Sequence, residues 1–352
     1  MTIYAKNRLL NECRWSSSRE ATFLECRKKY WYTYYGAWEG WPKTSFDSRS
    51  EVDPLASYLY MLKNMQPACM FVGSVVHKTI EWCLKTYEAT KRLPTLEEVR
   101  IHVQNGVKKG IQESSQKMWK NHPKHHTNLL EHYYNLPFDS SPLEEKARSC
   151  VDNWYSSACL QKIALNKRAA WKGIESMQTF SLEEGVEAIV VYDFFLIWHA
   201  RQDDSFMIIF DWKTGQESEK VETQLLAYAI AAKICFSVPL DKLILSPFYL
   251  SQGPQGYKKY GAKQEMPIDS TKIEELKKSI VSSAKAMLEL HPRKNAEGIF
   301  PTPTSLQFPY TEDRRHCKKC SFQELCQATN YQEKEKEELG NLVKEKFASC
   351  MR

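Results

Sequence analysis

Hydrophobic residues recur with two different periods along this chain of 352 residues, and the change of period outlines its fold. Between about residues 73 and 92, apolar side chains recur every three to four positions, at Val76, Ile80, Leu84 and Tyr87. This spacing places them on one face of a helix, so we expect a helix with a single buried stripe. Another helix is expected to begin near Ser17, because Ser17 and Glu20 have the spacing of a capping box.

The middle of the chain has the pattern of β-strands instead. Residues 186–198 and 205–212 are rich in β-branched and aromatic side chains, and a short polar stretch separates them, which predicts an antiparallel hairpin. A helix is expected directly after this hairpin, a further strand at 243–250, a late helix from about residue 273 and a terminal helix after Gln332. Central strands bracketed by helices predict a mixed α/β fold.

Composition narrows the class of protein. The shares of hydrophobic residues (42%) and charged residues (26%) are those of an ordinary globular protein. No apolar run approaches the roughly 18 residues of a membrane span, and the first residues lack the features of a signal peptide. We therefore expect a soluble protein of the cytoplasm or another reducing intracellular compartment, without a membrane partner. Eleven scattered cysteines argue against a disulfide framework and raise the question of metal binding.

Two acidic residues and a lysine stand out within the predicted hairpin. Asp193 interrupts an otherwise apolar strand, whereas Asp211 and Lys213 end the next strand. Residues two apart project from the same face of a strand, so Asp211 and Lys213 point together, and Asp193 can lie near them if the hairpin pairs. Carboxylate oxygens suit Mg²⁺ or Mn²⁺, and a nearby lysine can orient or deprotonate an attacking water. Taken alone, the D-x-K pattern is weak, because edge-strand charges and turn residues also produce it.

Motifs on both sides of the hairpin strengthen this interpretation. Gly73 and His77 form G-x-x-x-H on the first helix, and Gln224 and Tyr228 form Q-x-x-x-Y on the helix that follows the hairpin. The order of these motifs around the Asp-bearing strand and D-x-K-T-G resembles the RecB-like branch of the PD-(D/E)XK nuclease superfamily. The resemblance implies a restriction-endonuclease-like core, in which helices flank a mixed sheet.

The same resemblance implies a role for each motif residue. The implied metal ligands are His77, Asp193, Asp211 and the backbone carbonyl of Trp212. The implied catalytic residues are Asp193, Asp211 and Lys213. Gln224 and Tyr228 would contact the DNA strand or brace the active site. Glu81, which lies one turn after His77, is a weaker candidate because the family motif does not require it.

A second signal lies near the C-terminal end, where three cysteines have the spacing C-x2-C-x5-C: Cys317, Cys320 and Cys326. Three thiolates leave a tetrahedral site incomplete, so a fourth ligand must come from elsewhere. Zinc, with His316 or another cysteine as the fourth ligand, is one solution, and three unrelated structural cysteines are another. Cys26, in FLECRKKYWYTYY, is similar to the N-terminal cysteine of iron–sulfur nucleases related to AddB and the CRISPR-adaptation nucleases. This resemblance implies a 4Fe-4S cluster held by Cys26 and the three C-terminal cysteines. Arg27 replaces the proline that usually follows, so Cys13 is a rival for the N-terminal ligand.

We expect one nuclease unit over residues 1–352. Its expected parts are an N-terminal cluster segment with the first core helix (1–92), a helical insertion (93–172), the nuclease core (173–300) and a C-terminal cluster segment with a tail helix (301–352). Lysines in the insertion and aromatic rings in the N-terminal stretch suit the binding of a DNA strand, although rings packed around the cluster would give the same pattern. Three histidines, His122, His125 and His126, have the basic, proline-containing context typical of a solvated loop.

The expected function is metal-dependent hydrolysis of DNA phosphodiester bonds, by an exonuclease that favours single strands or ends. The expected cofactors are Mg²⁺ or Mn²⁺ and a 4Fe-4S cluster, and the expected partners are DNA and a helicase or other DNA-processing protein. Two other classes stay open: a DNA-binding scaffold without turnover, and a cluster-based redox-sensing subunit of a helicase–nuclease or DNA-processing complex. The intact Asp–Asp–Lys set favours the enzyme over the scaffold.

Overall fold

The computed structural model describes residues 9–42, 52–157, 160, 165, 169–199, 205–253 and 266–351. The chain divides into two compact units, which we treat separately. The first unit comprises Met1–Pro67, Gln112–Leu136 and Ser283–Arg352, and the second comprises Ala68–Ile111 and Pro137–Ser282. The expected single nuclease unit with four segments stays a prediction, because this division does not decide which segments fold together.

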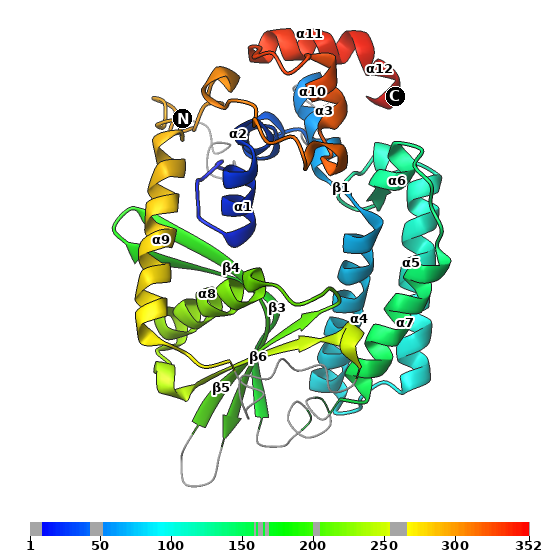
Figure 1. Ribbon diagram of the computed structural model, residues 1–352, viewed down its shortest axis with the longest axis vertical. Helices are drawn as coiled ribbons and strands as arrows, with labels where there is room; N and C mark the ends of the chain where they lie inside the picture. Colours follow the sequence, from blue (N-terminus) through cyan, green and yellow to red (C-terminus); the bar gives the residue numbers. More distant parts are fainter. Residues whose placement is uncertain are drawn as a thin grey trace. The chain divides into compact units, whose positions relative to one another are not determined.

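Within the described residues, the second unit contains a four-stranded mixed sheet (Figure 1). Its strands, in spatial order, are β3 (Ala169–Glu183), β4 (Val186–His199), β5 (Ser205–Lys213) and β6 (Leu243–Tyr249). Neighbouring strands from β3 to β5 are antiparallel, whereas β5 and β6 are parallel. A parallel pair needs a crossover connection, and α8 (Glu219–Phe236) provides it. The predicted mixed α/β fold, its antiparallel hairpin and the helix after the hairpin are confirmed.

Helix α8 lies across the sheet and contacts all four strands (Figure 1). Its buried residues surround most of the helix, and they include Leu225, Tyr228 and Ala229. A helix that is apolar on most of its circumference is a core helix, so its position relative to the strand ends is fixed by packing. This packing holds Gln224 and Tyr228 beside the end of β5. A later helix, α9 (Ser270–Glu289), begins in the second unit and ends in the first.

Three long helices form the rest of the second unit: α4 (Ala68–Thr90), α5 (Leu96–Ser115, whose last turn belongs to the first unit) and α7 (Ser141–Tyr155). Three of the four residues of the predicted stripe, Val76, Ile80 and Leu84, are fully inaccessible to solvent, whereas Tyr87 is half-buried. Helix α4 therefore exists as predicted, although it begins five residues earlier. Of the described helices, none is long and apolar enough to cross a membrane.

The first unit is mainly helical. Its elements are α1 (Ser17–Glu25), α2 (Arg27–Trp31), a π-helical turn (Tyr32–Gly36), α3 (Pro54–Lys63), β1 (Met65–Gln66), β2 (Asn128–Leu129), α6 (Leu130–Tyr133), α10 (Gln323–Ala328), α11 (Lys336–Lys346) and α12 (Ala348–Met351). The core of this unit is aromatic, and its fully buried rings include Tyr30, Trp31, Tyr32 and Tyr58. Most of the N-terminal aromatic stretch is therefore core, and two of its later tryptophans are the exception described below.

Two expectations about local structure are wrong. Helix α1 is capped by Ser16, whose hydroxyl accepts a hydrogen bond from the Arg19 N–H at 3.2 Å, so Ser17 and Glu20 do not form the capping box. Strand β3 was not expected, although it pairs with β4 over most of its length. Polar residues alternate unevenly along β3, and register shifts at 171–173 and 181–183 break the two-residue period that would have indicated a strand.

Candidate functional site

The end of β5 places a carboxylate and an ammonium side by side in the second unit. Asp211 is 0% exposed, and Lys213 Nζ lies 2.8 Å from Asp211 Oδ1. Apart from this ion pair, neither oxygen of the carboxylate accepts a hydrogen bond from a described residue. A buried carboxylate with unused acceptor capacity is unfavourable, because it has lost its water without gaining enough partners. The geometry therefore fits a site that a cation completes.

Lys213 is held from its other side by the helix that follows. Its Nζ donates a hydrogen bond to Gln224 Oε1 at 2.9 Å, and Gln224 Nε2 donates to the Tyr228 hydroxyl at 2.5 Å. The Tyr228 hydroxyl in turn donates to the Val191 carbonyl on β4 at 2.8 Å. This chain of hydrogen bonds fixes the ammonium relative to both strands. The two roles that the resemblance implied for Gln224 and Tyr228, contact with the DNA strand or bracing of the active site, stay predictions.

His77 reaches the same strand end from α4. Its Nε2 lies 2.5 Å from the Trp212 carbonyl oxygen, and its Nδ1 lies 2.9 Å from Glu175 Oε1. A metal-bound histidine commonly donates its second ring N–H to a carboxylate, which fixes the tautomer and the ring orientation. The Trp212 carbonyl can only accept, so this contact is a hydrogen bond from the Nε2–H, and a bound cation would take the place of that proton between two electron-pair donors.

Gly73 of the G-x-x-x-H motif allows this approach of α4. A Cβ at this position would lie 3.1 Å from Thr214 Oγ1, which is closer than most side-chain contacts. The glycine therefore lets the helix pass close to the turn that follows Lys213. This contact explains in physical terms why the motif that carries His77 begins with a glycine.

Glu175 is a site residue that the sequence analysis missed. It lies in β3, between residues that pair with Tyr192 and Phe194, so the register places it opposite Asp193. Its φ of 48° lies in the left-handed region, which a residue with a side chain adopts only at an energetic cost. An acidic residue within a strand was the only signal in the sequence, and its meaning depends on a strand that was not predicted.

Two other candidates have different outcomes. Asp193 belongs to β4, but its side chain lies outside the described residues, so its role as a ligand stays a prediction. Glu81 pairs with Lys85 on the same helix face at 2.5 Å, which is an ordinary surface interaction. Within the described residues, no three His, Cys, Asp or Glu side chains form a group that could hold one metal ion.

In the first unit, four cysteines line one pocket, which we call the cysteine pocket: Cys26, Cys317, Cys320 and Cys326. Cys26 is the N-cap of α2, and the other three come from the turn and helix near the C-terminal end, 291 or more residues later. His316 also lines this pocket. Cys13 is not one of its lining residues and lies instead with its Sγ 3.9 Å from the Tyr30 hydroxyl.

The thiols of the cysteine pocket influence one another's ionisation. Burial raises the pKa of the Cys320 thiol to about 11, and the neighbouring Cys26 and Cys317 add to this rise. The pKa of Cys326 is raised first by burial and then by its neighbours Cys320, Cys26 and Cys317. A crowded, desolvated set of thiols becomes a set of thiolates when positive charge is supplied, as iron or zinc does. The chemistry of the donor set thus suits a thiolate-bound metal centre, although in the described part of the chain no three of these thiols are grouped so that they could hold one metal ion.

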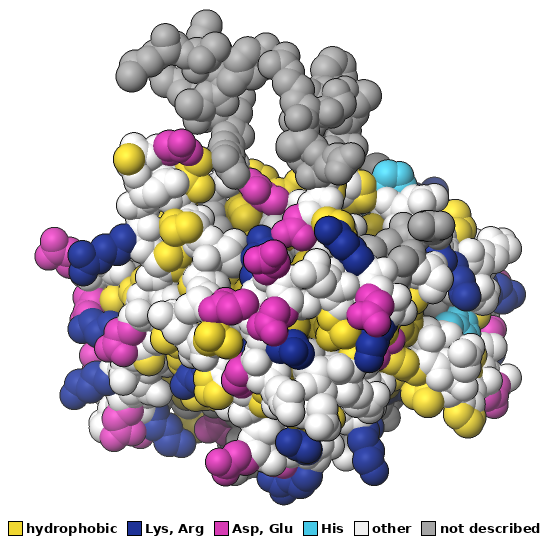
Figure 2. Space-filling model, turned by 90° about the horizontal axis from the view of Figure 1, so that it is seen from above, with side chains coloured by type: hydrophobic (Ala, Val, Ile, Leu, Met, Phe, Trp, Pro, Cys, Tyr) yellow, Lys and Arg dark blue, Asp and Glu magenta, His cyan; other side chains and the backbone are white. Residues whose placement is uncertain are grey.

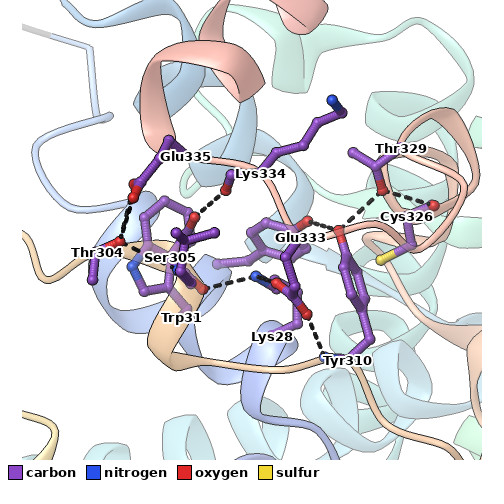
Figure 3. A network of polar contacts seen from close by, with 12 residues as sticks. Lys28, Trp31, Thr304, Ser305, Tyr310, Cys326, Thr329, Glu333, Lys334 and Glu335 are labelled. Carbon is purple, nitrogen blue, oxygen red and sulfur yellow. Dashed lines mark hydrogen bonds and ion pairs between the residues drawn. The ribbon is translucent and has the colours of Figure 1, made fainter.

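A polar network joins the N-terminal and C-terminal segments beside this pocket (Figure 3). The Lys28 side chain, 1% exposed, donates a hydrogen bond to the Ser305 carbonyl at 2.8 Å and pairs with Glu333. The Trp31 indole N–H donates to the Pro303 carbonyl at 2.8 Å. These contacts connect α2 to the segment before α11 through protein groups alone.

Comparison with known protein families identifies the family to which the chain belongs. A family model described as the PD-(D/E)XK nuclease superfamily matches residues 14–327. The chain belongs to the PD-(D/E)XK nuclease superfamily. Membership implies nuclease activity in general, and PD-(D/E)XK nucleases typically use Mg²⁺ or Mn²⁺. No curated protein matches the chain significantly.

For a PD-(D/E)XK chain, the end of β5 has the arrangement that gives the superfamily its name. Asp211 and Lys213 stand in the order D-x-K, and the matched range extends across both of them and the four cysteines. The restriction-endonuclease-like fold expected from the sequence is confirmed by this match together with the mixed sheet.

Proposed function

We propose that this PD-(D/E)XK chain is a metal-dependent deoxyribonuclease that hydrolyses phosphodiester bonds and acts as an exonuclease on single strands or ends. One observation carries the proposal: Asp211 is fully buried, and among the described residues its carboxylate is ion-paired only with Lys213 and accepts no hydrogen bond. A purely structural ion pair at this depth would be expected to have its remaining lone pairs satisfied by protein donors. The preference for single strands or ends rests on the resemblance to RecB-like nucleases.

The proposed metal ligands combine oxygen and imidazole donors: His77, Asp193, Asp211 and the Trp212 carbonyl. Oxygen donors are the preferred partners of Mg²⁺, and an imidazole is accepted by Mn²⁺. When bound, the ion polarises the scissile phosphate and lowers the pKa of a bound water. Glu175 keeps the His77 ring in the orientation that presents Nε2 to this site.

Lys213 has the second task in the proposed mechanism. Asp211 and Gln224 hold its ammonium from two sides, so it is oriented before substrate binds. A preorganised ammonium can position the attacking water and stabilise the negative charge that develops on the phosphate oxygens. Gln224 and Tyr228 then act as positioning residues, because they reach the reaction only through Lys213.

We also propose that Cys26, Cys317, Cys320 and Cys326 hold a 4Fe-4S cluster. Four thiolates are the usual ligand set of such a cluster, and the donors lie around one pocket with aromatic walls such as Tyr32 and Phe322. Its proposed role is structural, because its ligands belong to different motifs from Asp211 and Lys213. Metal analysis of anaerobically purified protein tests this part, and zinc without iron would overturn it.

The test of the main proposal uses internally labelled DNA in four forms: linear single strand, duplex, fork and circular single strand. We expect cleavage of linear single strands in Mg²⁺ or Mn²⁺, none in EDTA, and little of the circular strand, because an exonuclease needs an end. The Asp211→Asn protein should lose activity by about 1,000-fold, an effect typical of removing an essential charge from an active site. Asp241→Asn, an exposed aspartate in the same unit, is the matched control.

The outcomes separate the three classes of function. Activity that survives in Asp211→Asn would contradict the proposed site. A wild-type protein that binds DNA and never cuts it, with iron present, would favour the scaffold. Cleavage or partner binding that depends on cluster oxidation would favour the redox-sensing subunit, and cleavage of RNA in preference to DNA would change the substrate class.

A further inference from the structure

The first unit contains a second pocket, of about 750 Å³, which we call the aromatic pocket. It is lined by the rings of Trp38, Trp41 and Tyr60 and by a set of basic residues: Lys63, His122, Lys124 and His125. The sequence indicated a solvated loop for these histidines. In the structure His122 and His125 are exposed as expected, and the loop also forms one wall of a hollow whose other walls are aromatic, a combination with no role in the proposed hydrolysis.

The two tryptophans differ from the buried rings that precede them. Trp38 and Trp41 are half-buried, whereas Trp31 is fully buried. Their rings meet edge to face, with centroids 5.2 Å apart and planes at 87°, and Trp41 meets Tyr60 at 68°. In the described part of the chain, neither tryptophan has a ring stacked parallel on its face. A planar ligand could therefore stack there.

Gly40 fixes the turn that carries these rings. A Cβ at Gly40 would lie 1.9 Å from the carbonyl oxygen of Ala56, so only glycine lets this turn lie directly on α3. Tyr60 and Lys63 belong to the same helix, one and two turns further along. The rings and one of the lysines are thus presented on a rigid support, which lowers the entropic cost of binding a ligand.

The charge of the aromatic pocket is positive. Among its described lining residues there is no Asp or Glu. The pKa of Lys63 is lowered first by desolvation and then by the nearby cations Arg19 and Lys124, so the positive charges crowd one another. Glu113, the carboxylate beside the histidine loop, pairs with His126 at 3.2 Å and accepts the Thr127 N–H at 2.9 Å. That glutamate holds the loop in place, and the other basic side chains of the loop, His122, Lys124 and His125, are exposed.

This local charge contrasts with the face of the molecule that Figure 2 shows. On the face shown in Figure 2, basic and acidic side chains are interspersed and form no large area of one sign. A ligand attracted by charge would therefore be directed by local groups such as Lys63 and Lys124. Crowded cations beside open aromatic faces match a ligand that combines flat rings with regularly spaced negative charges.

We propose that the aromatic pocket binds unpaired bases and the adjoining phosphates of single-stranded DNA. Trp41, Trp38 and Tyr60 stack on bases, and Lys63 and Lys124 contact phosphates. Base stacking on aromatic side chains is tolerant of sequence, so the pocket would hold a strand of any sequence that the enzyme degrades. The choice of ligand rests on the proposed function, but the residues are separate from the proposed catalytic set.

The first test measures stacking. Wild-type protein in EDTA, which prevents cleavage, is titrated into a fluorescein-labelled 15-mer of thymidine, and binding is followed by anisotropy. Trp41→Leu should weaken binding about 10-fold, within the range found for loss of one stacked base, whereas Trp41→Phe should bind nearly as the wild type does. Trp82→Leu removes a half-buried tryptophan from the second unit and is the matched control. The corresponding 15-base-pair duplex should bind Trp41→Leu and wild type alike, because its bases cannot stack on the ring.

The second test measures phosphate contacts. The double variant Lys63→Gln/Lys124→Gln should reduce the slope of log affinity against log salt by about 1.4, at about 0.7 for each contact with a single strand. Lys344→Gln/Lys346→Gln removes the same charge from exposed positions of the first unit and should leave the slope nearly unchanged. Cross-linking with a 5-iodouracil oligonucleotide provides an independent readout, and the modified peptide should contain Trp38, Trp41 or Tyr60.

These measurements can fail separately from the proposed function. Equal weakening by Trp41→Leu and Trp82→Leu, an unchanged affinity of Trp41→Leu, or cross-links only outside the aromatic pocket would overturn the inference even if the protein cleaves DNA. Binding that depends on Trp41 in a protein that never cleaves DNA would support the inference and contradict the nuclease. Thermal melting of each variant shows whether it is folded. If Trp41→Leu does not fold, Trp41→Phe keeps the test valid.

Discussion

The end of β5 and the cysteine pocket are both proposed metal centres, but they are held together in different ways. Asp211, Lys213 and Gln224 lie within 14 consecutive residues, and their positions follow from one strand, one turn and one buried helix. The cysteine pocket joins residues from opposite ends of the sequence, and the polar network around Lys28 connects the same two segments beside it. The first site is locally organised and electrostatically incomplete, whereas the second is assembled over a long distance and supported by protein contacts.

This difference indicates whether each metal is expected to contribute mainly to catalysis or mainly to stability. Around Asp211 the protein supplies the geometry and leaves acceptor capacity of the carboxylate unused, so an ion there should matter for chemistry more than for stability. Around Cys26 the cluster would join two distant segments, so it should matter for stability. Its contribution to the free energy of unfolding should be limited, because the polar network around Lys28 already connects these segments. The predictions below test this division, from the largest expected effect to the smallest.

The cluster should give the largest effect on stability. Cys320→Ala should abolish the brown visible absorbance and lower the free energy of unfolding by at most about 5 kcal/mol, the value for a disulfide that closes a loop of comparable length. Iron content and thermal melting under anaerobic conditions measure the two effects. Cys69→Ala, at an exposed cysteine outside the cysteine pocket, is the control. A variant that retains full iron content would contradict the ligand assignment.

Removing the polar contacts of Lys28, which connect the same two segments, should lower the free energy of unfolding by less than removing the cluster does. Lys28→Met leaves the Ser305 carbonyl and Glu333 without a buried partner and should lower the free energy of unfolding by about 2–3 kcal/mol, with iron content retained. Lys336→Met removes an exposed ion pair with Asp53 and should change stability by less than about 1 kcal/mol. Chemical denaturation measures both. Equal effects of the two substitutions would show that the network around Lys28 does not connect the segments.

Glu175 offers the corresponding test near Asp211. Glu175→Gln should weaken Mn²⁺ binding about 10- to 100-fold, because loss of a carboxylate that orients a metal-bound histidine typically has this effect. Glu183→Gln, on the same strand, is the control. Calorimetric titration with Mn²⁺ separates weaker metal binding from a folding defect, and unchanged affinity would make Glu175 an ordinary partner of His77.

The smallest effect concerns pH. Burial, reinforced by Arg19, lowers the pKa of His291 from its ordinary value of 6.5 to about 4. The unfolded chain therefore binds a proton that the folded chain resists, and stability should fall as the pH decreases from 6.5 towards 4. His291→Gln should weaken this dependence, whereas His125→Gln, at an exposed histidine of the same unit, should not. Denaturation at a series of pH values measures how stability depends on pH. Parallel curves of stability against pH for wild type and His291→Gln would contradict the prediction.

The sequence analysis predicted features that depend on residues close together in the sequence, and it missed features that depend on contacts between distant segments. Helix α4, the hairpin and α8 were predictable because each is encoded by a local period of apolar residues. Asp211 and Lys213 were recognisable because they are neighbours on one strand. Glu175 was missed because its contact with His77 depends on the register of an unpredicted strand and on a positive φ.

The aromatic pocket illustrates a second kind of limit. The sequence showed tryptophans in one stretch and histidines in another, but it could not show that Trp41 and His122 line the same hollow. It also could not divide the N-terminal rings into those that form the core and those that remain open. That division depends on the close contact between Gly40 and α3, which has no periodic signal.

The binding of Mn²⁺ near Asp211 tests the central claim most directly. Electron paramagnetic resonance of free Mn²⁺ counts the ions that the iron-loaded protein binds, for wild type, Asp211→Asn and the control Asp241→Asn. Our account predicts a bound ion in wild type and in Asp241→Asn that disappears in Asp211→Asn, because the buried carboxylate is then neutral and no longer attracts a cation. Undiminished binding of Mn²⁺ by folded Asp211→Asn protein would contradict the proposed metal site and the hydrolytic mechanism built on it.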